Sequence, residues 1–315
     1  MSEKPLVSVV IVFQNTRDFI DEAIISVFRQ TFTDWELLLV DDGSTDGSDE
    51  VARRYAVEYP DRVRYLHHAG RENRGISATR NLGISSARGR YIASLDSDDV
   101  WLPQLLERQV EFAGAHPGAA MIYGPVQRWY SWTGKPEDNA RDFVAKPLHE
   151  YDVLVDPPAL VPIILQRQYA VPLGFLIDRE AAQAVGAYED EFRGMNDDQV
   201  FLCKLCLRYP VFIMSDWGYR YRRHPNSIVW VTNSGGERLA NRAVFLEWLT
   251  AYLKEQKIED PQVWKAVRSE LWKCRYPRFV EQRERIEYWG NRVRRRFKRM
   301  WSESAMNNSW KDGVP

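Results

Sequence analysis

The stretch "LVSVVIVFQN", residues 6–15, decides the fold class. Its residues are almost all apolar, and many are β-branched. A run of this kind without regular polar alternation is typical of a strand buried on both faces, as in a parallel sheet. The run ends in polar residues, and apolar residues then recur at helical spacing: Phe19, Ile20, Ala23, Ile24, Val27 and Phe28.

Strand and helix patterns continue to alternate over about the first hundred residues. This alternation predicts an α/β fold with a Rossmann-like sheet that is mixed but mostly parallel and flanked by helices. The further strands are expected at 34–44, 62–68 and 90–96, and the helices between them at 45–60 and 75–89.

The remaining chain is less regular. Strand and helix patterns continue to about residue 235, although 127–160, rich in Trp, Tyr, Pro and charge, is predicted to form long loops. Beyond that point the pattern is helical and increasingly basic. The predicted organisation is a catalytic domain at 1–235 with a helical extension at 236–301 and a disordered tail at 302–315. Within the domain, about 1–100 forms a nucleotide-binding half and 101–235 an acceptor half.

Composition excludes several classes of protein. The net charge of −1 over 315 residues gives no case for nucleic-acid binding. Three cysteines are too few for a disulfide framework and favour a reducing compartment. Neither a signal peptide nor an apolar run of about 18 residues is found, so a cytoplasmic protein is expected.

Two acidic clusters follow neighbouring strands. They are "VDDGSTDGS" at 40–48 and "SLDSDD" at 94–99. Either cluster alone could be a solvated turn with helix caps. Together they favour a ligand site, because ligands of open α/β sheets bind beyond the carboxyl ends of the strands. Hard oxygen ligands on a short loop suit Mg²⁺ or Mn²⁺. The glycine-rich motifs of dinucleotide and P-loop sites are absent.

Four motifs in order carry a family resemblance: "VSVVIVFQN", "SVFRQTFTDWELLLVDDGSTDGS", "NRGISATRNLGISSARGRYIASLDSDD" and "NDDQVFLCKL". Over about residues 5–225 the sequence resembles the family 2 glycosyltransferases, which have the GT-A nucleotide-sugar fold. The resemblance implies a metal-dependent, inverting transfer of a sugar from a nucleotide-diphospho-sugar, UDP-linked in the first instance, to a hydroxyl acceptor. It points to bacterial glycan, cell-envelope or exopolysaccharide assembly.

The resemblance also implies roles on the donor side. Asp42 would hold the uracil or ribose, and Asp96 would contact the ribose. Asp98 would bind the Mn²⁺ or Mg²⁺ that bridges the diphosphate, with Asp99 as a helper that reaches the metal or only caps the turn. Arg80 matches a basic position near the phosphates.

Further roles follow for the rest of the site. Asp198 matches the catalytic base, with Asp197 as the second choice. His224 matches a histidine that is a further metal ligand in some relatives, with a purely structural role as the alternative. Phe13 and Asn15 end the first strand at the nucleotide-sugar site, and the ring of Phe13 could replace the aromatic residue that many relatives carry at the position of Gln14.

Aromatic residues suggest two partner surfaces. Trp129, Tyr130 and Trp132 could stack on an acceptor sugar or lipid, or could pack their loop onto the core. Residues 285–301 form a basic helix with an aromatic stripe, which either lies on an anionic membrane surface or docks on the catalytic domain.

Two rival functions differ in class from glycosyl transfer. A sugar-nucleotide pyrophosphorylase would need a Gly-rich basic loop after the first strand, and the sequence "VFQNTRD" has none. A non-catalytic nucleotide-sugar-binding relative would keep Asp42 and Asp98 but would have no use for Asp198.

Overall fold

The structure is a computed structural model that describes residues 4–145, 149–166, 172–193, 195–225, 227 and 238–279. The chain divides into two compact units, Met1–Val267 and Arg268–Pro315. The first unit contains both sheets and the site. The basic helix predicted at 285–301 and the tail predicted at 302–315 lie outside the described residues. Within the described ranges, no helix combines the length and the apolar character needed to cross a bilayer.

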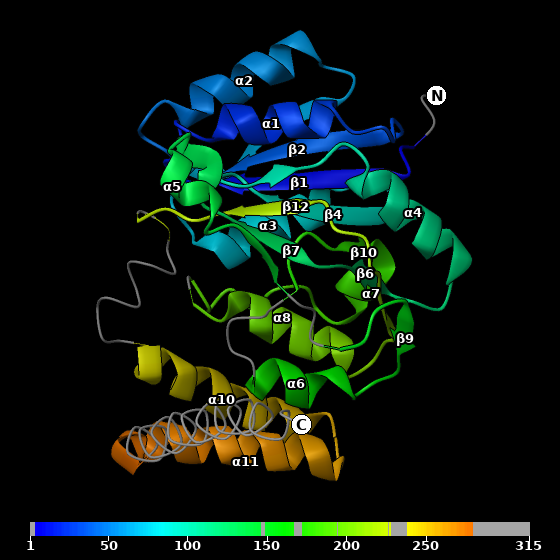
Figure 1. Ribbon diagram of the computed structural model, residues 1–315, viewed down its shortest axis with the longest axis vertical. Helices are drawn as coiled ribbons and strands as arrows, with labels where there is room; N and C mark the ends of the chain where they lie inside the picture. Colours follow the sequence, from blue (N-terminus) through cyan, green and yellow to red (C-terminus); the bar gives the residue numbers. More distant parts are fainter. Residues whose placement is uncertain are drawn as a thin grey trace, which may run out of the picture. The chain divides into compact units, whose positions relative to one another are not determined.

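The main sheet has eight strands in the order β3-β2-β1-β4-β10-β6-β11-β9. The first four run parallel, β10 is antiparallel to both of its neighbours, and β9 is antiparallel to β11 (Figure 1). The predicted mixed, mostly parallel sheet is thus confirmed. In chain order, its strands are β1 (Val7–Phe13), β2 (Trp35–Asp41), β3 (Val63–His67), β4 (Tyr91–Asp96), β6 (Met121–Tyr123), β9 (Val153–Val155), β10 (Leu176–Asp178) and β11 (Val211–Ile213).

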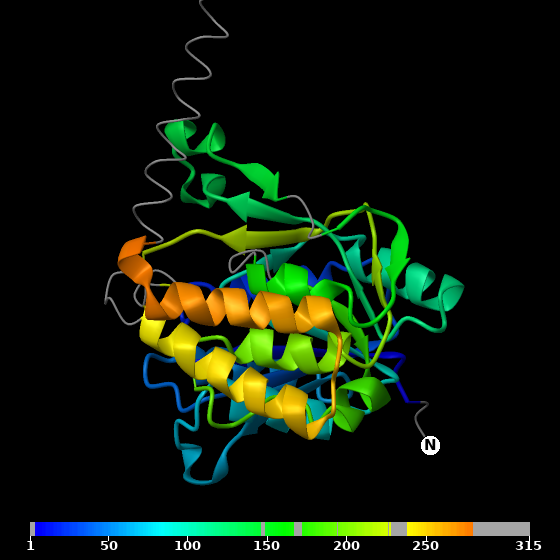
Figure 2. The same ribbon diagram turned by 90° about the horizontal axis from the view of Figure 1, so that it is seen from below.

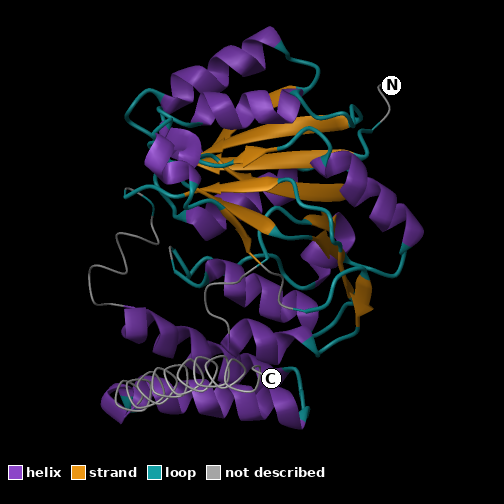
Figure 3. Ribbon diagram, viewed as in Figure 1, coloured by secondary structure: helices purple, strands orange, loops and turns teal. Residues whose placement is uncertain are grey.

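Helices flank this sheet, as predicted (Figure 3). The helices of the part of the chain that the structure describes are α1 (Ile20–Phe28), α2 (Ser48–Glu58), α3 (Ile76–Ser86), α4 (Leu105–Ala115), α6 (Leu160–Gln166), α7 (Arg179–Ala184), α8 (Asp197–Cys206), α10 (Arg238–Glu255) and α11 (Pro261–Arg275). The short elements are α5 (Pro136–Asn139) and the 3₁₀ turns η1 (Ala69–Arg71) and η2 (Ser131–Thr133).

The central strands are buried on both faces. Every residue of β1 and β2 is buried. On one face, α3 packs directly on β1 and β2. A Cβ atom at Gly83 of α3 would lie only 2.5 Å from a Cγ atom of Val10, so the absence of a side chain allows this close approach. The continuous apolar run that opens the sequence therefore reflects burial from two sides.

A second sheet of four strands has the order β5-β12-β7-β8 (Figure 2). Its strands are β5 (Val100–Trp101), β7 (Val126–Trp129), β8 (Phe143–Ala145) and β12 (Tyr219–Arg222). The prediction of long loops at 127–160 is wrong, because this range contains most of β7 together with α5, β8 and β9. These strands are only three or four residues long, and β7 and β12 are rich in arginine and aromatic residues, so they lack the apolar pattern that marks a strand.

Candidate functional site

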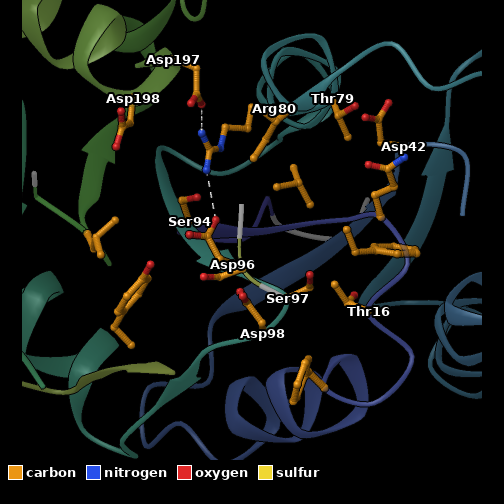
Figure 4. A pocket seen from close by; sticks show the side chains of 18 of the residues that line it. Thr16, Asp42, Thr79, Arg80, Ser94, Asp96, Ser97, Asp98, Asp197 and Asp198 are labelled. Atoms are coloured by element: carbon orange, nitrogen blue, oxygen red, sulfur yellow. Dashed lines mark hydrogen bonds and ion pairs between the residues drawn. The ribbon is translucent and has the colours of Figure 1, made fainter. Parts of the chain in front are cut away.

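A cavity of about 870 Å³ opens at the carboxyl ends of the parallel strands. It is lined by the ends of β1, β2 and β4, by the first turn of α8 and by the second sheet. Figure 4 shows the acidic residues around this space. Its volume lies in the range of small-molecule sites, and its position is the one that open α/β sheets use for ligands.

Asp42 follows β2 and faces the cavity, where its carboxylate holds a neighbouring loop. Oδ1 accepts hydrogen bonds from the backbone N–H groups of Arg74 at 2.7 Å and Gly75 at 3.2 Å. The next residue, Gly43, has a positive φ of 76°, and a Cβ atom there would lie 2.8 Å from the carbonyl oxygen of Arg71. The "DDG" sequence thus brings this loop against the end of β2, with the carboxylate of Asp42 beside the cavity.

Its neighbour Asp41 points away from the cavity into the protein. Its carboxylate accepts hydrogen bonds from the backbone N–H of Ser44 and the hydroxyl of Tyr65, both at 2.8 Å. Successive residues of a strand point to opposite sides, which separates the structural carboxylate from the cavity-lining one.

Phe13 and Asn15, at the end of β1, also line the cavity. Asn15 has a positive φ of 52°, and its side-chain oxygen accepts a hydrogen bond from the backbone N–H of Thr45 at 2.8 Å. Its own backbone N–H donates to the hydroxyl of Ser44 at 3.1 Å. These bonds tie the loop after β1 to the loop after β2, as expected for two loops that form one site.

Arg80 of α3 lies between two carboxylates that come from different parts of the sequence (Figure 4). It forms an ion pair with Asp96 at the end of β4, at 3.1 Å, and another with Asp197 at the start of α8. Burial raises the pKa of both carboxyl groups, and the guanidinium opposes that shift. Arg80 therefore joins the strand end to the helix start, and its charge is already matched by these two carboxylates.

Asp198 lies next to Asp197 on α8 but forms no ion pair among the described residues. Its Oδ1 accepts a hydrogen bond from the backbone N–H of Gln199 at 2.7 Å, and the side chain lines the cavity. Burial raises the pKa of this carboxyl group, while the charge of Arg80 lowers it. A carboxylate with a raised pKa that faces a cavity has the properties of a general base.

Asp98 and His224, which both line the cavity, contact each other. Nε2 of His224 lies 2.9 Å from Oδ2 of Asp98, and the two residues follow β4 and β12 respectively. The ring of His224 also packs against Phe19, with ring centroids 4.8 Å apart. Its Nδ1 atom is buried and has no hydrogen-bond partner among the described residues.

This pair fits a divalent cation that is shared with a ligand. Within the described ranges, no cluster of three or more His, Cys, Asp or Glu side chains could enclose a metal ion. Asp98 and His224 offer one carboxylate and one imidazole, both of which are ligands of Mn²⁺. A cation held by one or two protein ligands completes its shell with water and substrate phosphates.

Asp99, which the sequence also predicts as a helper ligand, lies on the other side of the turn. Its backbone N–H donates to the carbonyl of Asp96 at 3.0 Å, and its side chain is fully buried. The two carboxylate oxygens accept hydrogen bonds from the hydroxyl of Tyr219 and the backbone N–H of Arg222, both at 2.7 Å. We therefore assign Asp99 a structural role, because the turn directs it away from the cavity that Asp98 lines.

Of the three aromatic residues predicted to meet the acceptor, only Tyr130 lines the cavity. The ring of Trp129 lies 4.6 Å and that of Trp132 lies 5.2 Å from the guanidinium of Arg222. The indole N–H of Trp132 donates to the carbonyl of Arg223 at 3.1 Å. Both tryptophans thus pack the second sheet, which agrees with the alternative that these rings support their own loop.

The second sheet contributes cavity-lining side chains that no sequence motif marked: Arg128, Phe143, Tyr219, Tyr221 and Arg223. They lie on β7, β8 and β12 or directly after β12. A signal was present in "VQRWY" at 126–130 and "YRYRR" at 219–223, where alternate positions form one face of a strand.

The sheet order, the acidic strand ends and the cavity are those of a GT-A type nucleotide-sugar transferase fold. Solved structures with this fold agree. The crystal structure of S. aureus TarS 1–349 in complex with UDP-GlcNAc is similar to this chain, with a TM-score of 0.62 and 16% identity. The match covers 86% of this chain and 72% of the TarS chain. The mannosyltransferase PcManGT of Pyrobaculum calidifontis, in complex with GDP-Man and Mn²⁺, gives a TM-score of 0.57 and 16% identity. This match covers 99% of the present chain and 89% of PcManGT.

Sequence comparison gives the family. Residues 8–158 match the model of glycosyl transferase family 2, so this part of the chain belongs to that family. TuaG of Bacillus subtilis (strain 168), named as a candidate glycosyltransferase of teichuronic acid biosynthesis, is 43% identical over 110 residues, which are 35% of this chain and 42% of TuaG. GlyG, a glycosyltransferase of Streptococcus pneumoniae serotype 4, is 42% identical over 108 residues, 34% of each chain. The chain thus spans well under half the length of these relatives.

Proposed function

We propose that this chain transfers a sugar from a nucleotide-diphospho-sugar, UDP-linked in the first instance, to a hydroxyl acceptor with inversion at the anomeric carbon. The observation that carries the proposal is the position of Asp198. This carboxylate, which forms no ion pair within the described part of the chain, lies in the same cavity as the donor-side residues Asp42 and Asp98. Nucleotide-sugar binding alone would not require it, so its place in the cavity favours catalysis over a non-catalytic binding role.

The donor would lie along the strand ends. Asp42 is placed to accept a hydrogen bond from the base or ribose, since a carboxylate has acceptor capacity beyond its bonds to the 74–75 loop. Asp98 and His224 would hold Mn²⁺ or Mg²⁺ against the diphosphate. When bound, such an ion neutralises charge that develops on a leaving diphosphate.

The acceptor hydroxyl would approach Asp198. A hydroxyl group has a high pKa and loses its proton as the new C–O bond forms, so a carboxylate within hydrogen-bond reach lowers the barrier. Attack on the anomeric carbon from the side opposite the nucleoside diphosphate breaks the C–O bond to that group and inverts the centre. No second carboxylic acid is needed to protonate the leaving group.

Arg80 has a revised place in this proposal. Sequence resemblance assigns it to the donor phosphates, but its two ion pairs leave it matched by Asp96 and Asp197. We propose that Arg80 fixes the start of α8 relative to the end of β4. Asp197 is then a partner of Arg80 rather than an alternative base.

The wider setting also remains a proposal. The relatives' names support a role in bacterial cell-envelope or exopolysaccharide assembly. Attachment to an anionic membrane surface through 285–301 would suit a lipid-linked acceptor, and a catalytic domain at 1–235 followed by a helical extension remains the proposed organisation.

A nucleotide panel tests the proposal. Thermal unfolding is measured with UDP, GDP and CDP, each with Mn²⁺ and with EDTA, because a ligand that binds only the folded state raises the unfolding midpoint. UDP with Mn²⁺ should give the largest rise, and Asp98→Asn should reduce it. Release of UDP from UDP-sugars should then depend on Asp198. If no nucleoside diphosphate moves the midpoint at millimolar concentration, the proposed function is wrong; a preference for GDP corrects only the base.

A further inference from the structure

One face of the second sheet lines the cavity, and alternate residues of β12 show which face it is. Tyr219, Tyr221 and Arg223 line the cavity, whereas Arg220 and Arg222 between them do not. Side chains of a strand alternate between its two faces, so the first three share one face. Arg222 on the other face forms an ion pair with Glu22 of α1.

The neighbouring strands add to the same face. In the register of the sheet, Arg128 of β7 lies opposite Tyr221 on one side and opposite Phe143 of β8 on the other. All three line the cavity, as does Tyr130 just after β7. The result is a row of aromatic, cationic and aromatic side chains across three strands.

Two positive charges meet at one ring on this face. The guanidinium carbons of Arg128 and Arg223 lie 4.5 Å and 5.4 Å from the ring centroid of Tyr221. Burial lowers the pKa of Arg128, and the charge of Arg223 adds to that shift. Among the described residues, Arg223 forms no ion pair with a carboxylate. An anion in the cavity would offset this local repulsion.

Along the rest of the cavity, aspartates outnumber the arginines, which are Arg17, Arg80, Arg193 and Arg242. Its strand ends and the start of α8 carry carboxylates, and Arg80 there is already matched by Asp96 and Asp197. A negatively charged acceptor that approached Asp198 would therefore meet repulsion unless another part of the cavity supplied cations. The second sheet supplies such cations, because Arg128 and Arg223 line the cavity.

We propose that Arg128 and Arg223, with the ring of Tyr221, form a subsite for a phosphoryl group of the acceptor. The inference rests on the proposed function and adds the class of acceptor, a phosphate-bearing polyol or sugar. Guanidinium groups bind phosphate oxygens through paired N–H donors, and two of them balance a phosphate dianion. Tyr130 and the exposed ring of Phe143 offer apolar surface beside it for a carbon skeleton.

A binding experiment on the full chain, saturated with Mn²⁺ and UDP, tests the subsite. The probe is sn-glycerol 3-phosphate, with glycerol as its uncharged counterpart, and titration calorimetry gives both dissociation constants. Arg223→Gln and Arg128→Gln should each weaken binding of the probe by about tenfold or more, the loss expected for one charge-assisted contact. Arg223→Lys should retain part of it, and glycerol should not bind at the same concentration.

The matched control is Arg220→Gln. Arg220 is the preceding arginine of β12 but lies on the opposite face, where its Nε donates to Gln127 at 3.0 Å. This variant should bind the probe like wild type. Thermal unfolding of every variant excludes loss of fold as the cause of a change.

Three outcomes would overturn the subsite. The first is no binding of the probe to wild type, and the second is equal binding to wild type and both arginine variants. In the third, UDP affinity, measured without the probe, falls in parallel with probe affinity, which would assign the arginines to the donor diphosphate. UDP affinity should instead stay within about threefold in Arg223→Gln, since the donor contacts are elsewhere. Failure of wild type to bind UDP would contradict the proposed function and is thus distinguishable.

Discussion

Nε2 of His224 lies 2.9 Å from Oδ2 of Asp98, although 126 residues separate the two in the chain. The distance is short because His224 follows β12 and Asp98 follows β4, and both strand ends reach the cavity. The two side chains offer their donor atoms to one point, where a single cation could contact both.

Replacing His224 tests whether this point is a metal site. His224→Ala should raise the Mn²⁺ concentration for half-maximal transfer by about tenfold or more, since loss of even an outer ligand partner costs about 10–100-fold in metal affinity. Transfer is measured against Mn²⁺ concentration, and UDP binding is measured in EDTA. His67→Ala, at the exposed last residue of β3, is the control. An unchanged Mn²⁺ dependence in His224→Ala would leave this residue with a structural role only.

Asp198→Asn tests the base. The variant should bind UDP normally and lose about 10²–10⁴-fold in kcat, the usual contribution of a general base. Asp18→Asn, a change in an exposed carboxylate at the cavity edge, should keep wild-type activity. Wild-type rates of transfer in Asp198→Asn would contradict the mechanism.

The pH dependence of transfer follows from the environment of Asp198. Burial raises the pKa of this carboxyl group, and a base must be deprotonated to act. Activity should therefore fall as the pH decreases through a value above the ordinary aspartate pKa of about 4. The profile of kcat/KM against pH measures this limb, which should vanish from the residual activity of Asp198→Asn. A limb at or below the ordinary value would show that Asp198 is not the titrating base.

Arg80→Gln should move the same limb to higher pH. The guanidinium lowers the pKa of Asp198, so its removal takes away the charge that opposes the effect of burial. Loss of two buried ion pairs also costs about 3–5 kcal/mol of stability, because it leaves carboxylates without a counter-charge. Arg80→Lys retains the charge and should keep the limb near its wild-type position. A limb that stays in place in a folded Arg80→Gln protein would contradict this electrostatic coupling.

Asp99→Ala should lower stability rather than act on the metal. The change leaves the hydroxyl of Tyr219 and the backbone N–H of Arg222 without their acceptor, at a cost of about 1–3 kcal/mol each when such groups are buried. Tyr219→Phe removes one of these bonds and should cost less, and Asp61→Ala on the surface should cost nothing measurable. Thermal unfolding of the three variants measures these losses of stability and ranks them. A change in Mn²⁺ affinity with unchanged stability would return Asp99 to the metal site.

The class of fold could be predicted from the sequence because its signals are local. The apolar runs that became β1 and β2 mark strands buried on both faces, and each needs only its own residues to be recognised. The acids after β2 and β4 are equally local, and parallel strands end at one edge of a sheet. That topology alone brings Asp42 and Asp98 to one cavity.

The division of labour within the site depended on tertiary structure. Asp98 and Asp99 are adjacent in the chain, yet a turn sends one to the cavity and the other to Tyr219. Arg80 forms ion pairs with Asp96 and Asp197. Asp197 lies 117 residues further along the chain, so no local pattern encodes that pair. The second sheet could not be predicted from the sequence, because its strands are short and the face that lines the cavity carries cationic and aromatic side chains. These strands therefore lack the alternation of apolar and polar residues by which a strand is recognised. Local sequence thus determined which strands carry the acids, and long-range packing decided which acid meets which partner.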